Sequence, residues 1–202
     1  MHFTERSQIN YRTSQEIRRQ ADRLLDPQFA DVDGISEDRR GTISVFSGPA
    51  PSVRRCKSSE QESTEIAKWL NEQISNGITE QEICLIVRSE NEVPRAIEAV
   101  KAAGCNSRRL CNSKTASILG VTVATMHLAK GLEFLAVGVM ACDDEVIPLQ
   151  ARIESVGDDA DLEEVYATER QLLYVACTRA RDCLIVSGIE PTSEFLDDFE
   201  QG

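Results

Sequence analysis

Residues 83–103, ICLIVRSENEVPRAIEAVKAA, combine the two patterns that decide the fold. The first five, Ile83–Val87, form a continuous apolar run, which suits a strand buried on both faces of a parallel sheet. Residues 92–103 predict a helix, in which Pro94 is tolerated because it sits in the first turn and after which Gly104 ends the helix. A buried strand followed at once by a helix is the repeating unit of an α/β protein.

The alternation of strands and helices continues on both sides of this unit. Apolar runs and helical spacing predict helices over 13–25, 59–75 and 172–181, and strands over 42–46, 121–125, 135–142 and 183–187. Strands that alternate with helices predict a parallel sheet with helices on both faces, that is, a three-layer α/β domain. Ligands of such sheets bind at the carboxyl ends of the strands, so we expect a functional site there.

Three polar stretches interrupt this pattern. Residues 47–58 hold two prolines and several serines, which favours a connector. Residues 154–169 contain seven acidic side chains, so we expect a solvated loop that leads into the last helix. The end of the chain from Glu190 is acidic and should be frayed. We therefore divide the chain into an N-terminal extension (1–8), one α/β domain (9–189) and an acidic tail (190–202).

The composition is that of a soluble globular chain, with 41% hydrophobic and 28% charged residues among 202. No apolar run approaches the roughly 20 residues that a membrane-spanning helix needs, and the first six residues show no secretory signal. We therefore expect a cytoplasmic protein with no membrane partner.

The seven cysteines include no Cys-x-x-Cys pair, and the chain has only two histidines, so neither a metal site nor a thiol enzyme is indicated. Four of the cysteines lie beside apolar residues: Cys84, Cys142, Cys177 and Cys183. We expect buried free thiols at these positions and no bound metal.

The net charge of −12 argues against a broad nucleic-acid surface, because phosphate binding depends on Lys and Arg. The charge is uneven, since residues 1–57 carry +2 and residues 58–202 carry −14. A local stripe of basic side chains on an acidic body would still allow contact with DNA.

No G-x-x-x-x-G-K-[S/T] sequence is present, so the chain has no phosphate-cradling P-loop. The nearest match to a magnesium-binding strand is Val137–Glu145, VGVMACDDE, and it has no P-loop upstream. We therefore expect the chain by itself to be unable to hold Mg-ATP for hydrolysis.

Three segments concentrate polar chemistry. Residues 122–134, TVATMHLAKGLEF, deliver a hydroxyl, an imidazole, an ammonium and a carboxylate after a strand; a capped helix with a solvated face is the equally favoured structural explanation. Residues 169–181, ERQLLYVACTRAR, place Arg179 and Arg181 at a helix end, where they either complement the helix dipole or reach a phosphate. Residues 9–16, INYRTSQE, set an aromatic beside an arginine, which either packs internally or stacks on a base.

Taken together, these segments resemble motifs IV, V and VI of UvrD/Rep-type superfamily 1 DNA helicases. The T-x-H-x-x-K-G-L-E-F and E-R-Q-L-L-Y-V-A-C-T-R-A-R sequences are similar to motifs V and VI, and N-Y-R-T-S-Q is similar to motif IV. The strand ICLIVRS over 83–89 resembles the one that follows motif IV. The resemblance spans about residues 9 to 188 and implies the second RecA-like domain of such a helicase, a P-loop NTPase-type fold without its own P-loop.

The resemblance also implies roles for individual residues. ATP with Mg²⁺ would be bound mainly by a first RecA-like domain, which this chain does not contain, and the domain described here would reach the nucleotide from across the cleft. Arg12 and Arg179 would contact the γ-phosphate as catalytic arginines, Tyr11 would lie against the adenine, and Glu133 would lie near the ribose. The residues implied for the single-stranded DNA track and its coupling to the cleft are Arg88, Thr125, His127 and Lys130.

Two features depart from the family pattern. The partner domain would have to come from the same or another chain, and only about thirty residues stand where larger relatives insert a helical 2B domain. The alternative to a helicase motor domain is a free-standing, non-catalytic module that binds DNA or a protein. The missing P-loop and the acidic charge favour that alternative, whereas retention of Arg12, Glu133 and Arg179 favours the motor domain.

Overall fold

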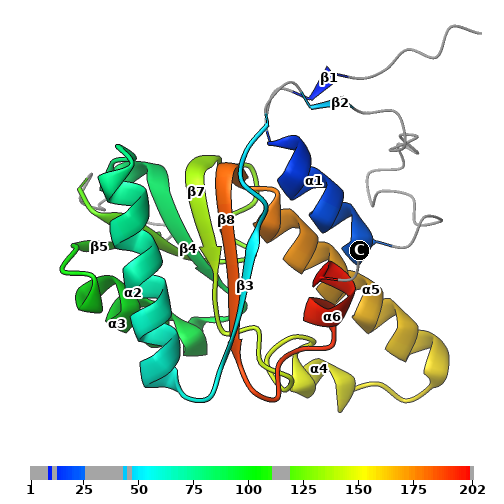
Figure 1. Cartoon of the computed structure of the whole chain (residues 1–202). Coiled ribbons are helices and arrows are strands. Elements are labelled where there is room, and N and C mark those ends of the chain that lie inside the picture. Colours follow the sequence, from blue (N-terminus) through cyan, green and yellow to red (C-terminus); the bar gives the residue numbers. More distant parts are fainter. Residues whose placement is uncertain (1–8, 11–12, 26–42, 45–46, 111–118, 201–202) are drawn as a thin grey trace, which may run out of the picture.

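The computed structural model describes residues 9–10, 13–25, 43–44, 47–110 and 119–200. A six-stranded sheet lies between two layers of helices (Figure 1). Every pair of neighbouring strands is parallel. The strand order is β3 (Ser52–Cys56), β8 (Ala180–Ile189), β7 (Phe134–Val139), β4 (Ile83–Val87), β6 (Val121–Thr125) and β5 (Ser107–Arg109). The predicted three-layer α/β fold is therefore confirmed.

Two apolar cores hold the helices on the sheet. One side is covered by α2 (Ser59–Ser75) and α3 (Val93–Ala102), which pack with Leu85 and Val123 of the sheet. The other side is covered by α1 (Gln15–Ala21), α5 (Asp159–Cys177) and α6 (Phe195–Glu200), which pack with Ile86 and Val137. Because all five residues of β4 and of β6 are buried, the centre of the sheet is covered on both faces.

Smaller elements complete the fold. Strand β1 (Ile9–Asn10) pairs in parallel with β2 (Ile43–Ser44) as a separate two-stranded sheet, and α4 (Gln150–Ile153) is a single turn before α5. None of the described helices is long and apolar enough to cross a membrane. Cys84, Cys142 and Cys177 are buried free thiols, as predicted, whereas Cys183 is only partly buried.

Strand β3 corrects the prediction of a connector over residues 47–58. It follows Pro51 and forms one edge of the sheet, where Arg54 and Arg55 are exposed. Charged side chains and a nearby proline are typical of edge strands, which must avoid pairing with other chains. The same features obscure the strand in the sequence. Strand β5, at the opposite edge, was not predicted at all.

The helix and strand at the end of the chain also differ from their predicted bounds. Helix α5 begins at Asp159, inside the predicted acidic loop, because Asp158 accepts a hydrogen bond from the backbone N–H of Asp161 at 2.9 Å. Acidic residues in a first turn complement the helix dipole. The helix ends at Cys177, so Arg181 belongs to β8 and not to the predicted helix over 172–181.

The acidic tail was predicted to be frayed, but it is ordered as a helix. It forms α6, in which Phe195, Leu196 and Phe199 are at most 1% exposed. The Arg170 guanidinium lies over the Phe195 ring, 4.3 Å from its centroid. The tail therefore packs on the core through apolar residues that alternate with its acidic ones.

Replacing Ser58 by alanine should destabilise the chain by about 1 kcal/mol, because the Ser58 hydroxyl caps α2 by accepting from the Gln61 N–H at 3.3 Å. Urea unfolding followed by circular dichroism measures the change. Replacing Ser75, which is exposed at the other end of α2, is the control and should have little effect. Equal effects of the two substitutions would contradict a capping role for Ser58.

Candidate functional site at two edges of the sheet

Arg179 lies in the turn between α5 and β8, where the parallel strands begin. We call this end of the sheet its amino edge, and the end where the strands finish its carboxyl edge. Its Nε donates to the carbonyl of Val175 at 3.0 Å, and its Nη1 donates to the carbonyl of Leu132 at 3.3 Å. Its own carbonyl accepts from the Phe134 N–H at 3.0 Å. The guanidinium is therefore oriented both by the end of α5 and by the segment that precedes β7, in which Glu133 is exposed.

The segment that resembles motif IV reaches the same edge. Tyr11 and Arg12 lie outside the described residues, but Thr13 and Ser14 follow them directly. The Thr13 hydroxyl donates to the carbonyl of Thr178 at 3.2 Å, and the Ser14 N–H donates to the carbonyl of Arg181 at 2.8 Å. Both residues are buried. The start of α1 is thus fixed against the backbone on either side of Arg179.

These placements correct the expectation that the functional residues gather at the carboxyl ends of the strands. Glu133 directly precedes β7 and Arg179 directly precedes β8, so both lie where the strands begin. Among the predicted site residues that the structure describes, only those predicted for DNA contact lie at the carboxyl edge, where the strands end. These described residues thus form two groups at opposite edges of one sheet.

The second group surrounds the carboxyl ends of β4 and β6. Val87 pairs with Thr125 at the end of both strands, and the Met126 N–H donates to the Val87 carbonyl at 2.9 Å. Thr125 is buried, whereas His127 and Lys130 are exposed in the turn that follows β6. Partial loss of hydration lowers the pKa of His127, as do the positive charges of the nearby Arg88 and Arg152, against the opposing charge of Glu169.

Arg88 points into the protein and not into solvent. It is 4% exposed, and its Nε and Nη2 donate to the two carboxylate oxygens of Glu169, each at 2.6 Å. Glu169 is fully buried and also accepts from Arg152 Nη1 at 3.0 Å and from the Leu149 N–H at 3.4 Å. Burial alone would raise the pKa of Glu169, but its bonds with Arg88 and Arg152 hold that pKa below its ordinary value.

Glu169 and Arg152 were not singled out from the sequence, although a signal for Glu169 exists. Val165, Glu169 and Leu173 are spaced four residues apart, so all three lie on one stripe of α5, and all three are buried. A carboxylate on the apolar stripe of a helix requires a buried cation or several donors. No comparable signal identifies Arg152.

Two chain segments connect the edges. Strands β6 and β7 are both parallel to β4, which lies between them, so residues 126–133 must cross from the carboxyl edge to the amino edge. Met126 and Ala129 of this segment are buried in the core. Helix α5 makes a second connection, since Glu169 contacts Arg88 at the carboxyl edge and the helix ends two residues before Arg179.

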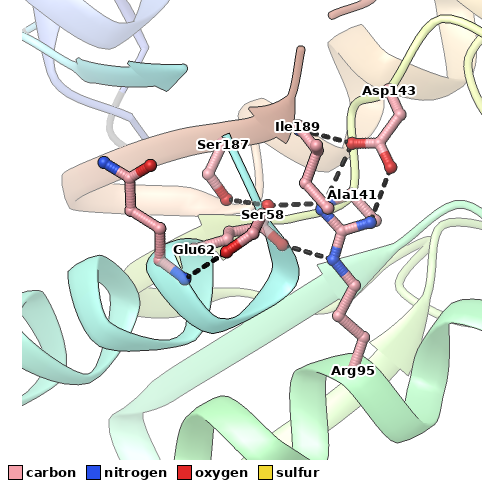
Figure 2. A network of polar contacts seen from close by, with 8 residues as sticks. Ser58, Glu62, Arg95, Ala141, Asp143, Ser187 and Ile189 are labelled. Carbon is pink, nitrogen blue, oxygen red and sulfur yellow. Dashed lines mark hydrogen bonds and ion pairs between the residues drawn. The ribbon is translucent and has the colours of Figure 1, made fainter. Parts of the chain in front are cut away.

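A separate polar network closes the carboxyl edge near β7 and β8 (Figure 2). The buried Glu62 carboxylate accepts from the Ser187 hydroxyl at 2.6 Å and from the Ala141 N–H at 3.2 Å, and it pairs with Arg95. Arg95 donates to Asp143 at 2.6 Å, and Asp143 also accepts from a backbone N–H of β8. Asp143 is the first of three acidic residues in the sequence that most resembles a magnesium-binding strand, and it is paired with an arginine.

The fold and the motif sequences define the class of protein: a RecA-like α/β domain that carries helicase motif residues but no P-loop sequence. Residues 97–191 match the family of UvrD-like helicase C-terminal domains. The predicted resemblance to UvrD/Rep-type helicases is thereby confirmed for this region of the chain.

Similar proteins agree with this family. The ATP-dependent DNA helicase PcrA of Staphylococcus epidermidis is 44% identical over 68 residues, which cover 34% of this chain and 9% of PcrA. YjcD of Bacillus subtilis, whose name as an ATP-dependent DNA helicase is provisional, is 47% identical over 70 residues, with the same coverage. The match thus spans about a tenth of the length of these relatives.

A solved structure shares the fold over nearly the whole chain. It is the C-terminal domain of a possible DNA helicase from Lactobacillus plantarum, with a TM-score of 0.65, 24% sequence identity and 95% coverage of both chains. At that identity the likeness supports the fold alone.

Proposed function

We propose that this chain is the C-terminal motor domain of an ATP-dependent DNA helicase and that it supplies Arg12 and Arg179 to ATP bound by a first RecA-like domain. The observation that carries the proposal is the placement of Arg179, whose guanidinium is held by two backbone carbonyls beside the motif V segment. The anchoring of Thr13 on Thr178 supports a position for Arg12 at the same edge.

The chemistry expected at the amino edge is stabilisation of charge during phosphoryl transfer. Arginine presents a planar fork of donors that matches phosphate oxygens, and an arginine from a partner domain can raise turnover about 10³–10⁵-fold. Arg12 and Arg179 would neutralise charge that develops on the γ-phosphate. Tyr11 would stack on the adenine and Glu133 would accept from a ribose hydroxyl, while Mg²⁺ and the P-loop contacts would come from the other domain.

Single-stranded DNA would lie along the carboxyl edge. His127 and Lys130 are exposed there, Thr125 ends β6, and Arg88 lies behind them in its pair with Glu169. Because residues 126–133 connect this edge to Glu133, a shift of the DNA-facing turn would be transmitted to the nucleotide side. The two domains would alternate between open and closed arrangements, and nucleotide binding would shift the balance between them.

ATP turnover with and without a first RecA-like domain tests the proposal. The chain alone should not hydrolyse ATP, and turnover stimulated by single-stranded DNA should appear when a UvrD-type first domain is present, either in the native polypeptide or added as a separate protein. An immunoblot of source cells shows which form is native. Hydrolysis by the chain alone would contradict the proposal. Absence of turnover in both forms would favour the non-catalytic module that the charge of −12 suggests.

A further inference from the structure

The ion-pair networks at the carboxyl edge differ in the sign of their net charge. Around β4 and β6, the single carboxylate of Glu169 is shared by Arg88 and Arg152, which leaves one positive charge in excess. Around β7 and β8, Glu62 and Asp143 share Arg95, which leaves one negative charge in excess. These two ion-pair networks thus carry net charges of opposite sign.

Ion pairs on the edge strand β3 also leave carboxylates in excess. Near its carboxyl end, Arg55 donates to Asp197 at 2.8 Å and to Glu200 at 2.6 Å, so two carboxylates share one guanidinium. In the networks beside β3, β8 and β7, the carboxylates outnumber the guanidinium groups. In the network beside β4 and β6, two arginines share one carboxylate, and the exposed His127 and Lys130 follow β6.

We propose that Arg152 is a phosphate-contacting residue of the nucleic-acid path and that Glu169 positions it, so that the path crosses the β4–β6 half of the carboxyl edge. The inference rests on the proposed function, because it takes single-stranded DNA as the ligand. It adds Arg152, a residue of α4 that lies outside all the motif-like segments. It also assigns the DNA path to the β4–β6 half of the carboxyl edge.

Arg152 is suited to this role by its exposure and by its support. Its side chain is 37% exposed, whereas that of Arg88 is 5% exposed, so of the two only Arg152 has a side chain that is substantially accessible to a ligand. Arg152 Nη1 donates to the same Glu169 oxygen that accepts from Arg88 Nη2. Because the bidentate Arg88 pair fixes that oxygen, Arg152 is held at a defined place, and little ordering is required when a phosphate binds.

The test is a salt titration of the chain binding to a fluorescent single-stranded oligothymidylate, followed by anisotropy. Each phosphate contact contributes about 0.7 to the slope of log K against log salt for single strands. Arg152→Gln should lower the slope by about 0.7 and weaken binding about fivefold at roughly 0.1 M salt, which is the factor that one such contact contributes relative to 1 M. Arg152→Lys keeps the charge and should retain most of the slope.

The matched control is Arg55→Gln, which removes the same charge from a side chain of similar exposure, 33%, on β3, where carboxylates are in excess. It should leave the slope unchanged. Equal slope changes for Arg152→Gln and Arg55→Gln would mean that only total charge matters, and this would overturn the inference. An unchanged slope for Arg152→Gln would also overturn it, as would a wild-type chain without salt-sensitive binding.

Failure of this test is distinguishable from failure of the proposed function. The DNA titration does not involve ATP, and the Arg179→Ala test of ATP turnover concerns a residue at the opposite edge. Folding of each variant is checked by the fluorescence of the single tryptophan, Trp69, which belongs to α2 and is only 8% exposed.

Discussion

Replacing Arg179 by alanine should lower ATP turnover about 10³-fold or more when a P-loop domain is present. Such a loss corresponds to about 4 kcal/mol of transition-state stabilisation. The reason is geometric, because two backbone carbonyls already direct the guanidinium at the amino edge. Steady-state ATP hydrolysis at saturating single-stranded DNA measures the effect.

Two further variants sharpen this experiment. Arg181→Ala removes an arginine two residues away whose side chain pairs with the neighbouring Asp182, so its turnover should stay within a few-fold of wild type. Arg179→Lys keeps the positive charge but loses the planar fork and should recover only part of the activity. Near-normal turnover of Arg179→Ala, with circular dichroism showing an intact fold, would exclude this arginine from catalysis.

The elements that could be predicted accurately are those whose burial leaves a strong pattern. Strand β4 is buried on both faces and reads as an unbroken apolar run, and its observed bounds, Ile83–Val87, are those predicted. Helix α2 matches its predicted bounds because apolar residues at helical spacing lie between a serine cap and Gly77. Both elements are specified by residues close together in the chain.

The elements that could not be predicted depend on contacts that are distant in sequence. Strand β3 reads as a polar connector because it gains its hydrogen bonds from β8, about 130 residues later in the chain, and exposes its arginines at the edge. Helix α6 is six residues long and half acidic, and it is stable because Phe195 and Phe199 enter a core that the rest of the chain has built. Short isolated helices are marginal in water, so local sequence alone does not predict this one.

The candidate site also combines features that local sequence indicates with features that depend on residues distant in the chain. The motif-like segments were recognised from their residue types, but their distribution over two edges follows from the strand order, which the sequence does not display. Arg88 illustrates the difference. Its position after β4 was predicted, whereas its burial against Glu169 requires a partner 81 residues away. Its role as a contact to the DNA backbone stays a prediction, and Arg152 is the more exposed candidate for that contact.

Replacing Glu169 by alanine should destabilise the fold by about 3–5 kcal/mol at neutral pH, because Arg88 would remain buried without a carboxylate. Urea unfolding followed by Trp69 fluorescence measures the loss. Glu163→Ala removes an exposed carboxylate from the same helix and should change stability by less than about 0.5 kcal/mol. A Glu169→Ala variant within about 1 kcal/mol of wild type would show that the pair contributes little.

Measurements in acid and on a double variant distinguish the contribution of the Arg88–Glu169 ion pair to stability from that of side-chain packing. The pKa of Glu169 lies below its ordinary value of 4.5, so its contribution is complete above that pH and is lost as the pH falls through the lowered pKa. The difference in the free energy of unfolding between wild type and Glu169→Ala should therefore become smaller in acid.

Arg88→Met combined with Glu169→Leu replaces the pair by apolar side chains, which often restores stability. If that double variant folds well yet its DNA-stimulated ATP turnover is lost, then the pair is retained for coupling the two edges and not for stability.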